Sequence, residues 1–331
     1  MFAGKKILIT GGTGSLGTAL TKRLLDLDVD TIRIFSRNES KQITMESEMG
    51  KDRIRYLIGD IRDYPRLQKA LEGIDIVFHA AALKHVPLIE YNPFEAIKTN
   101  VLGTQNVIDG CLKENVETVI GISTDKAVSP LNTYGATKLL MEKLFAATHN
   151  YLDKDRYRTK FVSLRYGNVL GSSGSVLPKF IKQIKAKEKI TITDSNMTRF
   201  SMTMDEALDF ILESATLGKG SEVFIPKLKA YSVNDLKNSL FELLEDTGEE
   251  IISLRPGEKM HEAFINTDEI RYAWELDNKY VLFNSSKSDD EIKREYPNIK
   301  RIKIPEEYSS NKVEKISSDD LKKIILKSGF L

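Results

Sequence analysis

The chain has 331 residues, with 49 Lys or Arg against 48 Asp or Glu, so its formal net charge is +1. The absence of a basic excess argues against a dedicated surface for nucleic acid or for an anionic membrane, and neither partner is expected. A hydrophobic share of 41% is typical of an ordered globule rather than a disordered chain. The single cysteine, Cys111, cannot form an internal disulfide or a multi-thiolate metal site.

Membrane insertion and secretion are also not expected. The longest strongly apolar stretches, such as Ile74–Leu83, have about ten residues, roughly half of what a bilayer span needs. The segment Met1–Thr10 runs directly into a pattern typical of a strand, so no secretory signal is predicted. Composition therefore favours a cytoplasmic protein that works without a metal.

In chain order, the first 165 residues alternate short β-branched runs with longer amphipathic segments. The short runs are continuously apolar, as in parallel strands covered by helices on both faces. Repeated strand–helix–strand order predicts an α/β protein with a doubly wound parallel sheet. The predicted strands are Lys6–Thr10, Thr31–Phe35, Ile54–Ile58, Ile74–Phe78, Thr118–Ile122 and Phe161–Leu164, and the helices include Leu16–Leu27, Asn92–Glu114 and Tyr134–Tyr151.

After about Asn168 this alternation ends, and the helices Met204–Leu217 and Val233–Leu244 are separated by short strands. We expect a dinucleotide-binding domain at residues 1–168, to which some later segments return, and a smaller substrate-binding region at residues 169–285. Residues 286–331 are rich in charges of both signs, which predicts a solvated tail. Ser317 is placed to cap a last helix within it.

A glycine-rich segment lies between the first predicted strand and the helix that follows. Gly11, Gly14 and Gly17 are three residues apart there. In a dinucleotide-binding turn, the first glycine permits a tight turn, the second lets the backbone approach a pyrophosphate, and the third lets helix and sheet pack closely. N–H groups at the helix N-terminus then bind the anion. The other predicted contacts in this segment are Thr13, Ser15 and Leu16.

The residues after the second predicted strand indicate the choice of cofactor. An NAD site usually has an acidic residue there for the ribose 2′-hydroxyl, whereas this chain has Arg37. A guanidinium can pair with a 2′-phosphate through two hydrogen bonds, so NADP is expected, with a plain surface arginine as the alternative. The remaining predicted cofactor contacts are Ser36, Asn38, Lys41, Asp60, Ile61, Ala80, Ala81 and Lys84.

Tyr134 and Lys138 open the helix after the fifth predicted strand, and Thr124 lies ten residues before Tyr134. Residues four apart share a helix face, so both side chains can contact one ligand. Because free tyrosine has a pKa near 10, a nearby Lys138 ammonium and a positive nicotinamide are expected to lower it. Tyr134 would then remove a hydroxyl proton while hydride leaves the same carbon, and Thr124 would hydrogen-bond the substrate oxygen. A packed tyrosine beside a solvated lysine is the alternative.

Together these motifs resemble the extended short-chain dehydrogenase/reductase family, in which a glycine-rich loop is coupled to Tyr-x-x-x-Lys. The run Ser123-Thr124-Asp125-Lys126-Ala127 is similar to the signature of inverting UDP-N-acetylglucosamine 4,6-dehydratases, whereas retaining dehydratases carry Thr-Asp-Glu there. The likeness covers roughly residues 1–270. Other matching segments are His79-Ala-Ala-Ala-Leu-Lys84-His-Val-Pro, Asn92-Pro-Phe-Glu-Ala-Ile-Lys-Thr-Asn100, Arg165-Tyr-Gly-Asn168-Val, Met197-Thr-Arg199-Phe and Arg255-Pro-Gly-Glu258-Lys.

The resemblance implies conversion of UDP-N-acetylglucosamine to UDP-2-acetamido-2,6-dideoxy-β-L-arabino-hexos-4-ulose without net redox change. Oxidation at C4 acidifies the C5 hydrogen, water leaves across C5–C6, hydride returns to C6, and C5 is reprotonated from the opposite face. The family pattern assigns Asp125 as the acid at the C6 hydroxyl and Lys126 as the base at C5. An ion-pair partner for Lys126 is an equal alternative for Asp125. Lys84, Lys138 and the oxidised nicotinamide are expected to lower the pKa of Lys126.

Candidate anchors for the sugar nucleotide come from the same segments. Arg199 and Arg255 offer forked donors to a diphosphate. Two other residues of these segments are expected to be structural. His79 is expected to be a core histidine with satisfied hydrogen bonds, and Asn100 is expected to bridge backbone groups. The other substrate candidates are Lys84, Asn168, Val176 and Glu258.

Two other readings stay open. A UDP-sugar 4-epimerase or a retaining nucleotide-sugar dehydratase could use the same scaffold without Asp125 and Lys126 at these positions. A non-enzymatic NADP-sensing protein is the third hypothesis, although such proteins usually lose the Tyr/Lys pair. Because members of this superfamily often pair through the helices after the fourth and fifth strands, a homo-oligomer is expected.

Overall fold

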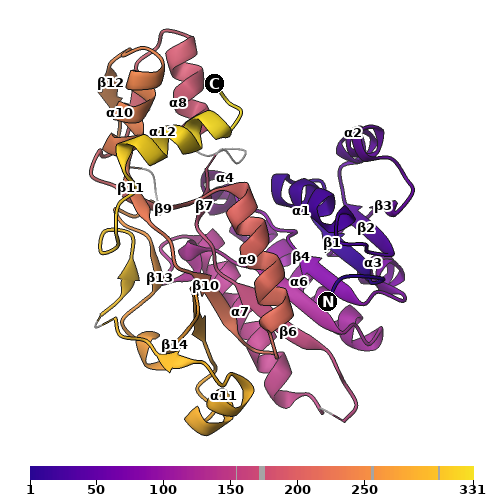
Figure 1. Ribbon diagram of the computed structural model, residues 1–331. Coiled ribbons are helices and arrows are strands. Elements are labelled where there is room, and N and C mark those ends of the chain that lie inside the picture. The colour runs from indigo at the N-terminus through magenta and orange to yellow at the C-terminus, as the bar shows by residue number, and fades with distance from the viewer. Residues whose placement is uncertain (154, 171–175, 255–256, 305) are drawn as a thin grey trace.

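The computed structural model describes residues 1–153, 155–170, 176–254, 257–304 and 306–331 (Figure 1). A ten-stranded sheet with the order β16-β14-β15-β10-β6-β5-β4-β1-β2-β3 forms its centre. Its strands are β1 (Lys6–Thr10), β2 (Thr31–Ser36), β3 (Ile54–Ile58), β4 (Ile76–His79), β5 (Thr118–Ile122), β6 (Lys160–Leu164), β10 (Val223–Pro226), β14 (Ala273–Leu276), β15 (Lys279–Leu282) and β16 (Lys300–Arg301). The strands from β3 to β10 run parallel, and β15, β14 and β16 extend the sheet antiparallel. The order 3-2-1-4-5-6 confirms the predicted doubly wound fold.

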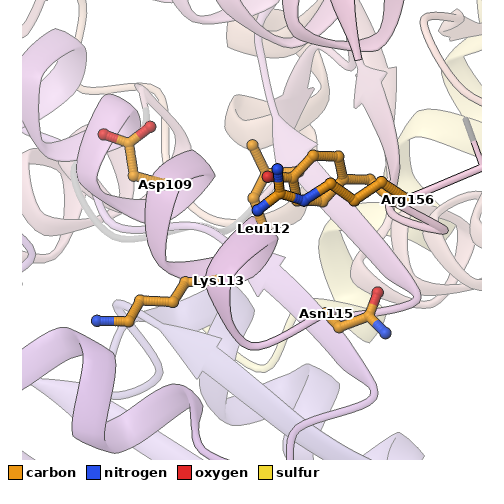
Figure 2. Close-up of a pocket in the computed structure, with 6 residues that line it drawn as sticks. Asp109, Leu112, Lys113, Asn115 and Arg156 are labelled. Atoms are coloured by element: carbon orange, nitrogen blue, oxygen red, sulfur yellow. The ribbon is translucent and has the colours of Figure 1, made fainter. Parts of the chain in front are cut away.

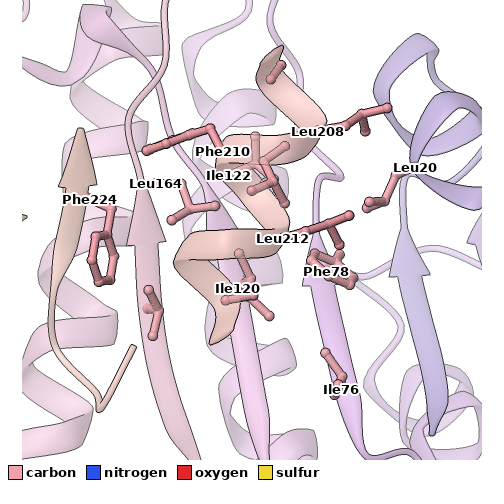
Figure 3. Packing of buried hydrophobic residues seen from close by; sticks show 14 of the residues in the cluster. Leu20, Ile76, Phe78, Ile120, Ile122, Leu164, Leu208, Phe210, Leu212 and Phe224 are labelled. Carbon is pink, nitrogen blue, oxygen red and sulfur yellow. The ribbon is translucent and has the colours of Figure 1, made fainter. Parts of the chain in front are cut away.

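Helices cover both faces of the sheet (Figure 1). Helices α1 (Ser15–Leu25), α2 (Glu39–Met49), α9 (Met204–Leu217) and α11 (Asp289–Glu295) contribute to one hydrophobic cluster, and α3 (Tyr64–Leu71), α6 (Gly103–Lys113) and α7 (Thr133–Tyr151) to another. Figure 3 shows α9 lying across the strands, with Leu208 and Leu212 beside Phe78 and Leu20 of α1. Since both faces of each inner strand are buried, the strands read as unbroken apolar runs.

The helix predicted from Asn92 to Glu114 is divided. It consists of α5 (Pro93–Ala96), the π-helix η1 (Ile97–Leu102) and α6, preceded by the short α4 (Val86–Tyr91). Inside η1, the Asn100 side chain accepts from Leu83 N at 2.8 Å and donates to Leu83 O at 2.9 Å. The π-turn thus aims Asn100 at the loop after β4, which confirms its structural role and explains the departure from a regular helix.

A smaller layer packs beside the carboxyl ends of the strands (Figure 1). Strands β7 (Asn168–Val169), β9 (Thr198–Met202) and β11 (Ala230–Ser232) form one sheet, and β8 (Ile190–Ile192) pairs with β12 (Glu249–Ile251). Helices α8 (Val176–Lys185), α10 (Val233–Leu243) and α12 (Ser318–Lys327) share a separate hydrophobic cluster. This layer therefore has a core of its own.

The charged C-terminal segment, which the sequence predicts as a solvated face, exposes its charges but also pairs and packs with the rest of the fold. Strand β16 pairs with β14 in the main sheet, and β17 (Tyr308–Ser309) pairs with β13 (Ala263–Ile265), next to the turn η3 (Ile270–Tyr272). Tyr308 and Tyr296 are buried, and α12 places Leu321 in the core of the smaller layer. The charged residues occupy the exposed positions while the sparse apolar ones face inward, which composition alone does not reveal. Ser317 does cap α12, accepting from Asp320 N at 3.2 Å, and the domain limits at residues 168 and 285 stay predictions.

Candidate active site

The turn between β1 and α1 packs closely against the neighbouring backbone because its glycines lack side chains. Gly11 has φ +69°, and a Cβ there would lie 2.8 Å from Ala81 Cα. At Gly17 it would lie 2.5 Å from Gly12 Cα, so helix and turn pack in contact. No side chain caps α1 and no acidic residue lies in its first turn, which contains Ser15 and Leu16. The residues present fit the diphosphate of a dinucleotide bound at a helix N-terminus.

The edge beyond β2 holds the residues predicted to choose the cofactor. The Arg37 guanidinium is 54% exposed and lies 3.7 Å from Asp60 Oδ2, which also pairs with Arg62 at 2.8 Å. Burial raises the pKa of Asp60, but hydrogen bonds from Arg62 and the charge of Arg37 hold it below its ordinary value. The Thr13 hydroxyl donates to Ser36 Oγ at 3.1 Å, which ties this edge to the glycine-rich turn.

Three other predicted cofactor contacts have structural roles at the same edge. Asn38 caps α2 by accepting from Lys41 N at 2.8 Å. Ile61 is buried and packs against Gly103, where an added Cβ would lie 2.7 Å from the Ile61 side chain. The Ile61 carbonyl also accepts a hydrogen bond from the Asn106 side chain.

The predicted catalytic residues meet at the carboxyl end of β5. The 3-10 turn η2 (Asp125–Ala127) follows that strand, and Thr124 Oγ1 donates to Asp125 Oδ1 at 2.8 Å. Lys126 Nζ lies 3.1 Å from the same Asp125 oxygen, and Tyr134 hydrogen-bonds the Thr124 side chain. Doubly wound folds bind ligands at this edge of the sheet, so the cluster stands where a ligand site is expected.

Gly135 allows the turn η2 to lie against the first turn of α7. A Cβ at this position would come within 2.0 Å of Lys126 O. Asn132 caps the same helix by accepting from Gly135 N at 2.8 Å. The glycine thereby sets the distance between Lys126 and Tyr134.

The predicted effect of Lys138 on Tyr134 is not what the structure shows. Lys138 Nζ donates to Ile122 O at 2.7 Å. Burial lowers the pKa of Lys138 to about 8, although the nearby Glu142 carboxylate acts to raise it. Burial raises the pKa of Tyr134 to about 12. The charge of Lys126 and the hydrogen bond with Thr124 act in the other direction and limit this rise. Lys126, rather than Lys138, therefore favours the Tyr134 phenolate.

The predicted lowering of the Lys126 pKa is wrong for this structure. Burial does favour the neutral amine, but the carboxylates of Asp125 and Glu262 outweigh it and raise the pKa of Lys126 above its ordinary value. Glu262 Oε1 lies 3.6 Å from Lys126 Nζ. Lys84 is close enough that its own pKa falls, through burial and the charge of Lys126.

Some predicted substrate anchors lie near this cluster and others do not. Arg199 in β9 acts electrostatically on Lys126 and pairs with Glu258 at 3.8 Å. Asn168 pairs with Ser201 at the base of the smaller layer. Val176 begins α8, packed against the core of that layer. Arg255 lies outside the described residues.

His79 has the structural role predicted for it. Its Nδ1 lies 2.8 Å from Thr10 Oγ1, and its Nε2 lies 2.9 Å from Thr104 Oγ1. Burial, with a contribution from the Lys138 charge, lowers the pKa of His79 to about 3. A neutral imidazole between two hydroxyls is a core residue rather than an acid or base.

Two pockets differ in their relation to this site. One of about 540 Å³, lined by Asp109, Leu112, Lys113, Asn115, Arg156 and Tyr157, lies near the amino ends of β5 and β6 (Figure 2). That is the edge opposite the catalytic cluster, so it is not the ligand site of a doubly wound fold. The other, of about 550 Å³, joins Ser15 of the glycine-rich turn to Thr203–Glu206 and to α12. It adjoins the cofactor turn.

Sequence reasoning missed Glu262, Tyr231 and Lys259. Tyr231 pairs with Arg199 across β11 and β9, and Lys259 Nζ donates to Val128 O at 2.6 Å. The available signal was position, because Lys259 stands inside the matched segment that begins at Arg255 and Glu262 follows soon after it. Nothing in their spacing indicated contact with Lys126.

A doubly wound fold with Thr124, Tyr134 and Lys126 clustered at the carboxyl end of β5 is the arrangement of the short-chain dehydrogenases/reductases. A family model described as "Polysaccharide biosynthesis protein" matches residues 7–284. The chain belongs to that family.

Individual relatives place it among dehydratases and epimerases. It is 45% identical over 88% of its length, and 86% of the relative, to a UDP-N-acetylglucosamine 4,6-dehydratase (inverting) of Campylobacter jejuni. It is 39% identical over 98%, and 96% of the relative, to a UDP-glucose 4-epimerase of Rickettsia bellii. The X-ray structure of Pen from Bacillus thuringiensis matches with a TM-score of 0.92 and 41% identity over all of both chains.

A further relative carries a name that suggests a different setting. The chain is 47% identical over 84% of its length, and 86% of the relative, to a Methanocaldococcus jannaschii protein named an uncharacterized membrane protein. In the part of this chain that the structure describes, no helix has the length and apolar character needed to cross a bilayer. Nor do the described residues include a group of three or more His, Cys, Asp or Glu placed to hold a metal.

Proposed function

We propose that the protein is an inverting 4,6-dehydratase that acts on UDP-N-acetylglucosamine and uses NADP. The observation that carries the proposal is the Thr124–Asp125–Lys126 turn beside Tyr134, in which Thr124 and Asp125 are buried and Lys126 is partly exposed. Elimination across C5–C6 needs a base and an acid in addition to the group that serves oxidation at C4, and this turn adds an amine and a carboxyl group. The inverting dehydratase relative at 45% identity supports the same reaction.

The glycine-rich turn would hold the NADP diphosphate, and Arg37 would pair with the 2′-phosphate. The partly exposed Arg37 guanidinium at the end of β2 supports this choice of cofactor. When bound, NADP would supply hydride chemistry, accepting hydride from C4 of the sugar and returning it to C6.

Tyr134 takes the proton of the C4 hydroxyl while Thr124 hydrogen-bonds the same oxygen. Burial raises the Tyr134 pKa, and the nearby Lys126 charge opposes that rise. Lys138, held on Ile122 O, fixes the face of α7 that carries Tyr134.

Asp125 and Lys126 then serve the elimination. A proton that moves from Lys126 Nζ to Asp125 Oδ1 across their 3.1 Å separation leaves a neutral amine and a carboxylic acid. The amine takes the C5 proton, the C5–H electron pair forms the enolate of the 4-ketone, and the C6–O bond breaks as Asp125 protonates the departing hydroxide. The pair thereby returns to its original charges, and Asp125 is both ion-pair partner and acid.

The sugar nucleotide would lie between the two layers of the molecule. Arg199, with Glu258 beside it, would bind the diphosphate. The other proposed contacts are Lys84, Asn168, Val176 and Arg255.

A UDP-sugar 4-epimerase is the second candidate, favoured by the Rickettsia relative that covers nearly the whole chain. An epimerase returns hydride to C4 and does not break the bond to the C5 hydrogen. It has no use for the acid and base that the Asp125–Lys126 pair provides.

Incubation with UDP-N-acetylglucosamine in deuterated water separates the two. A dehydratase gives a 4-keto-6-deoxy sugar with deuterium at C5 and the L-arabino configuration by NMR, while the cofactor is recycled. A C4 epimer without deuterium would establish the epimerase, and accumulation of NADPH equal to product would contradict both.

We also propose a homo-oligomer formed through the helices that follow β4 and β5. Helices α4, α5, η1 and α7 pack against one another, and their outer side chains include large exposed apolar residues. A second copy of this surface would cover them. The residues are Leu88, Tyr91, Phe94, Ile97, Leu102, Leu131 and Leu140.

A further inference from the structure

Glu262 is a buried carboxylate that contacts Lys126 from a part of the chain distant from Asp125. Its side chain is 4% exposed, and Oε1 lies 3.6 Å from Lys126 Nζ. Its second oxygen, Oε2, has no hydrogen-bond partner among the described residues, and neither has Asp125 Oδ2. Burying a carboxylate with an unsatisfied oxygen is costly unless a cation compensates, and Lys126 is the cation in contact.

The backbone holds Glu262 in place independently of the turn η2. Glu262 N donates to Ser310 Oγ at 3.0 Å, and Ser310 N donates to Glu262 O at 2.8 Å. Ser310 Oγ in turn lies 2.7 Å from Thr198 Oγ1 in β9. Glu262 is therefore fixed to the smaller layer and to β17, rather than following the lysine.

The segment that carries Glu262 is also tied to the catalytic turn and to the start of α7. Asn132 Nδ2 donates to Gly257 O at 3.0 Å, and Lys259 Nζ donates to Val128 O at 2.6 Å. Asn266 Nδ2 donates to Ser129 Oγ at 3.2 Å. These contacts on both sides of Glu262 fix the separation between its carboxylate and Lys126.

We propose that Glu262 is a positioning residue for the elimination: with Asp125 it clamps Lys126 Nζ between two carboxylates and stabilises the positive charge that the amine gains when the C5–H bond breaks. In that step the C5 proton moves to Nζ and its electron pair moves into the enolate, while Glu262 keeps its charge. The assignment rests on the proposed dehydratase function.

The charges around Lys126 determine the sign of the effect. Asp125 and Glu262 favour the ammonium, whereas Arg199 opposes it. Lys84, Lys259, Tyr134 and Tyr231 also face the amine electrostatically. Removing the Glu262 charge leaves the positive groups in place, so it lowers the pKa of Lys126.

Glu262→Gln tests the clamp, because it removes the charge and nearly keeps the shape. We expect the pH dependence of the reaction to change, because removing the charge lowers the pKa of Lys126 and so makes the neutral amine available at lower pH. The acidic limb of kcat/KM, which reports loss of the Lys126 proton, should move to lower pH by about one unit or more. Glu262→Asp keeps the negative charge but places it farther from Lys126, because the side chain is shorter. The acidic limb of its kcat/KM profile should therefore lie between the limbs of the parent and of Glu262→Gln. Glu314→Gln, which removes an exposed carboxylate paired with Lys229, is the matched control.

A measurement without substrate separates the clamp from the reaction. Competitive acetylation of Lys126 by acetic anhydride, followed by mass spectrometry, should show faster labelling in Glu262→Gln than in the parent or in Glu314→Gln at each pH. Melting temperature and NADP binding report folding, and Glu262→Asp carries the comparison if the Gln variant does not fold. A parent that labels as expected but forms no 4-keto sugar overturns the dehydratase and leaves the clamp standing. A parent that dehydrates, with limb and labelling unchanged in both Glu262 variants, overturns the clamp.

Discussion

Single charges decide the chemistry available at the carboxyl end of β5. Lys126 is held by two carboxylates, so it is an ammonium that must lose a proton before it can act as a base. Tyr134 is a buried phenol whose pKa burial raises to about 12, and Lys126 opposes that rise. The two groups are therefore coupled. The Lys126 amine assists the oxidation at C4 as a cation, and it is then needed as a neutral base at C5.

At the residue scale, Arg37→Glu should weaken NADP far more than NAD. The guanidinium lies 3.7 Å from Asp60 and is partly exposed, so reversing its charge places a second carboxylate beside the expected 2′-phosphate. Loss of a charge-assisted hydrogen bond costs about 1.5–3 kcal/mol, which raises the Kd for NADP by roughly tenfold to a hundredfold. Calorimetric titration with both cofactors measures it, with Arg158→Glu at an exposed pair as control. Equal weakening of NAD and NADP would rule out the role given to Arg37.

Among the elements, the contact between η2 and α7 sets the geometry of the site. The two approach so closely that Lys126 O lies where a Cβ on residue 135 would stand. Asn132 caps the start of α7, and its side chain also donates to Gly257 O in the segment that carries Glu262. One short helix end thus aligns Tyr134, Lys126 and Glu262.

Gly135→Ala should damage activity more than stability. The added Cβ must push η2 away from α7, which costs about 1–3 kcal/mol of unfolding free energy by overpacking. Displacing Lys126 from Tyr134 by even a small amount should reduce kcat by about a hundredfold. Thermal unfolding and initial rates check this, with Ala136→Ser on the exposed neighbouring position as the control. A variant with parent-like kcat would show that this contact does not position Lys126.

The molecule as a whole is a three-layer domain whose last segments close the site. β17 and α12 belong to the smaller layer, and Ser310 supports Glu262 from there. Helices α4, α5, η1 and α7 also present exposed apolar side chains. Surfaces of this kind mark interaction sites when several large apolar residues are contiguous.

Leu88→Glu combined with Tyr91→Glu should convert the proposed oligomer to monomers. Tyr91 is 87% exposed and Leu88 is 60% exposed, so neither substitution disturbs the core of the protomer. Introducing charges into a buried apolar contact leaves them unpaired, which opposes association. Sedimentation velocity measures the change, and Leu326→Glu on exposed α12 is the control. A parent that sediments as a monomer would contradict the oligomer itself.

The sequence by itself determined the features that contiguous residues encode. The glycine-rich turn, the strands of the doubly wound sheet and the Ser317 cap depend on local conformation and on short-range periodicity, which a linear pattern records. The Thr124–Lys126 run and the Tyr134/Lys138 spacing likewise predicted residues that the structure brings together, since one strand end and the next helix carry these side chains. The break in the helix before α6 was not readable, because it depends on where Asn100 meets the loop after β4.

Only the tertiary structure decided which charges face Lys126 and where the tail goes. Glu262 reaches Lys126 from a distant part of the chain, and together with Asp125 it outweighs burial, so the pKa of Lys126 rises. The tail is charged overall yet buries Tyr296, Tyr308 and Leu321, since the few apolar residues determine its packing. Electrostatic energy and burial depend on distance in space, and distance along the chain does not determine either one.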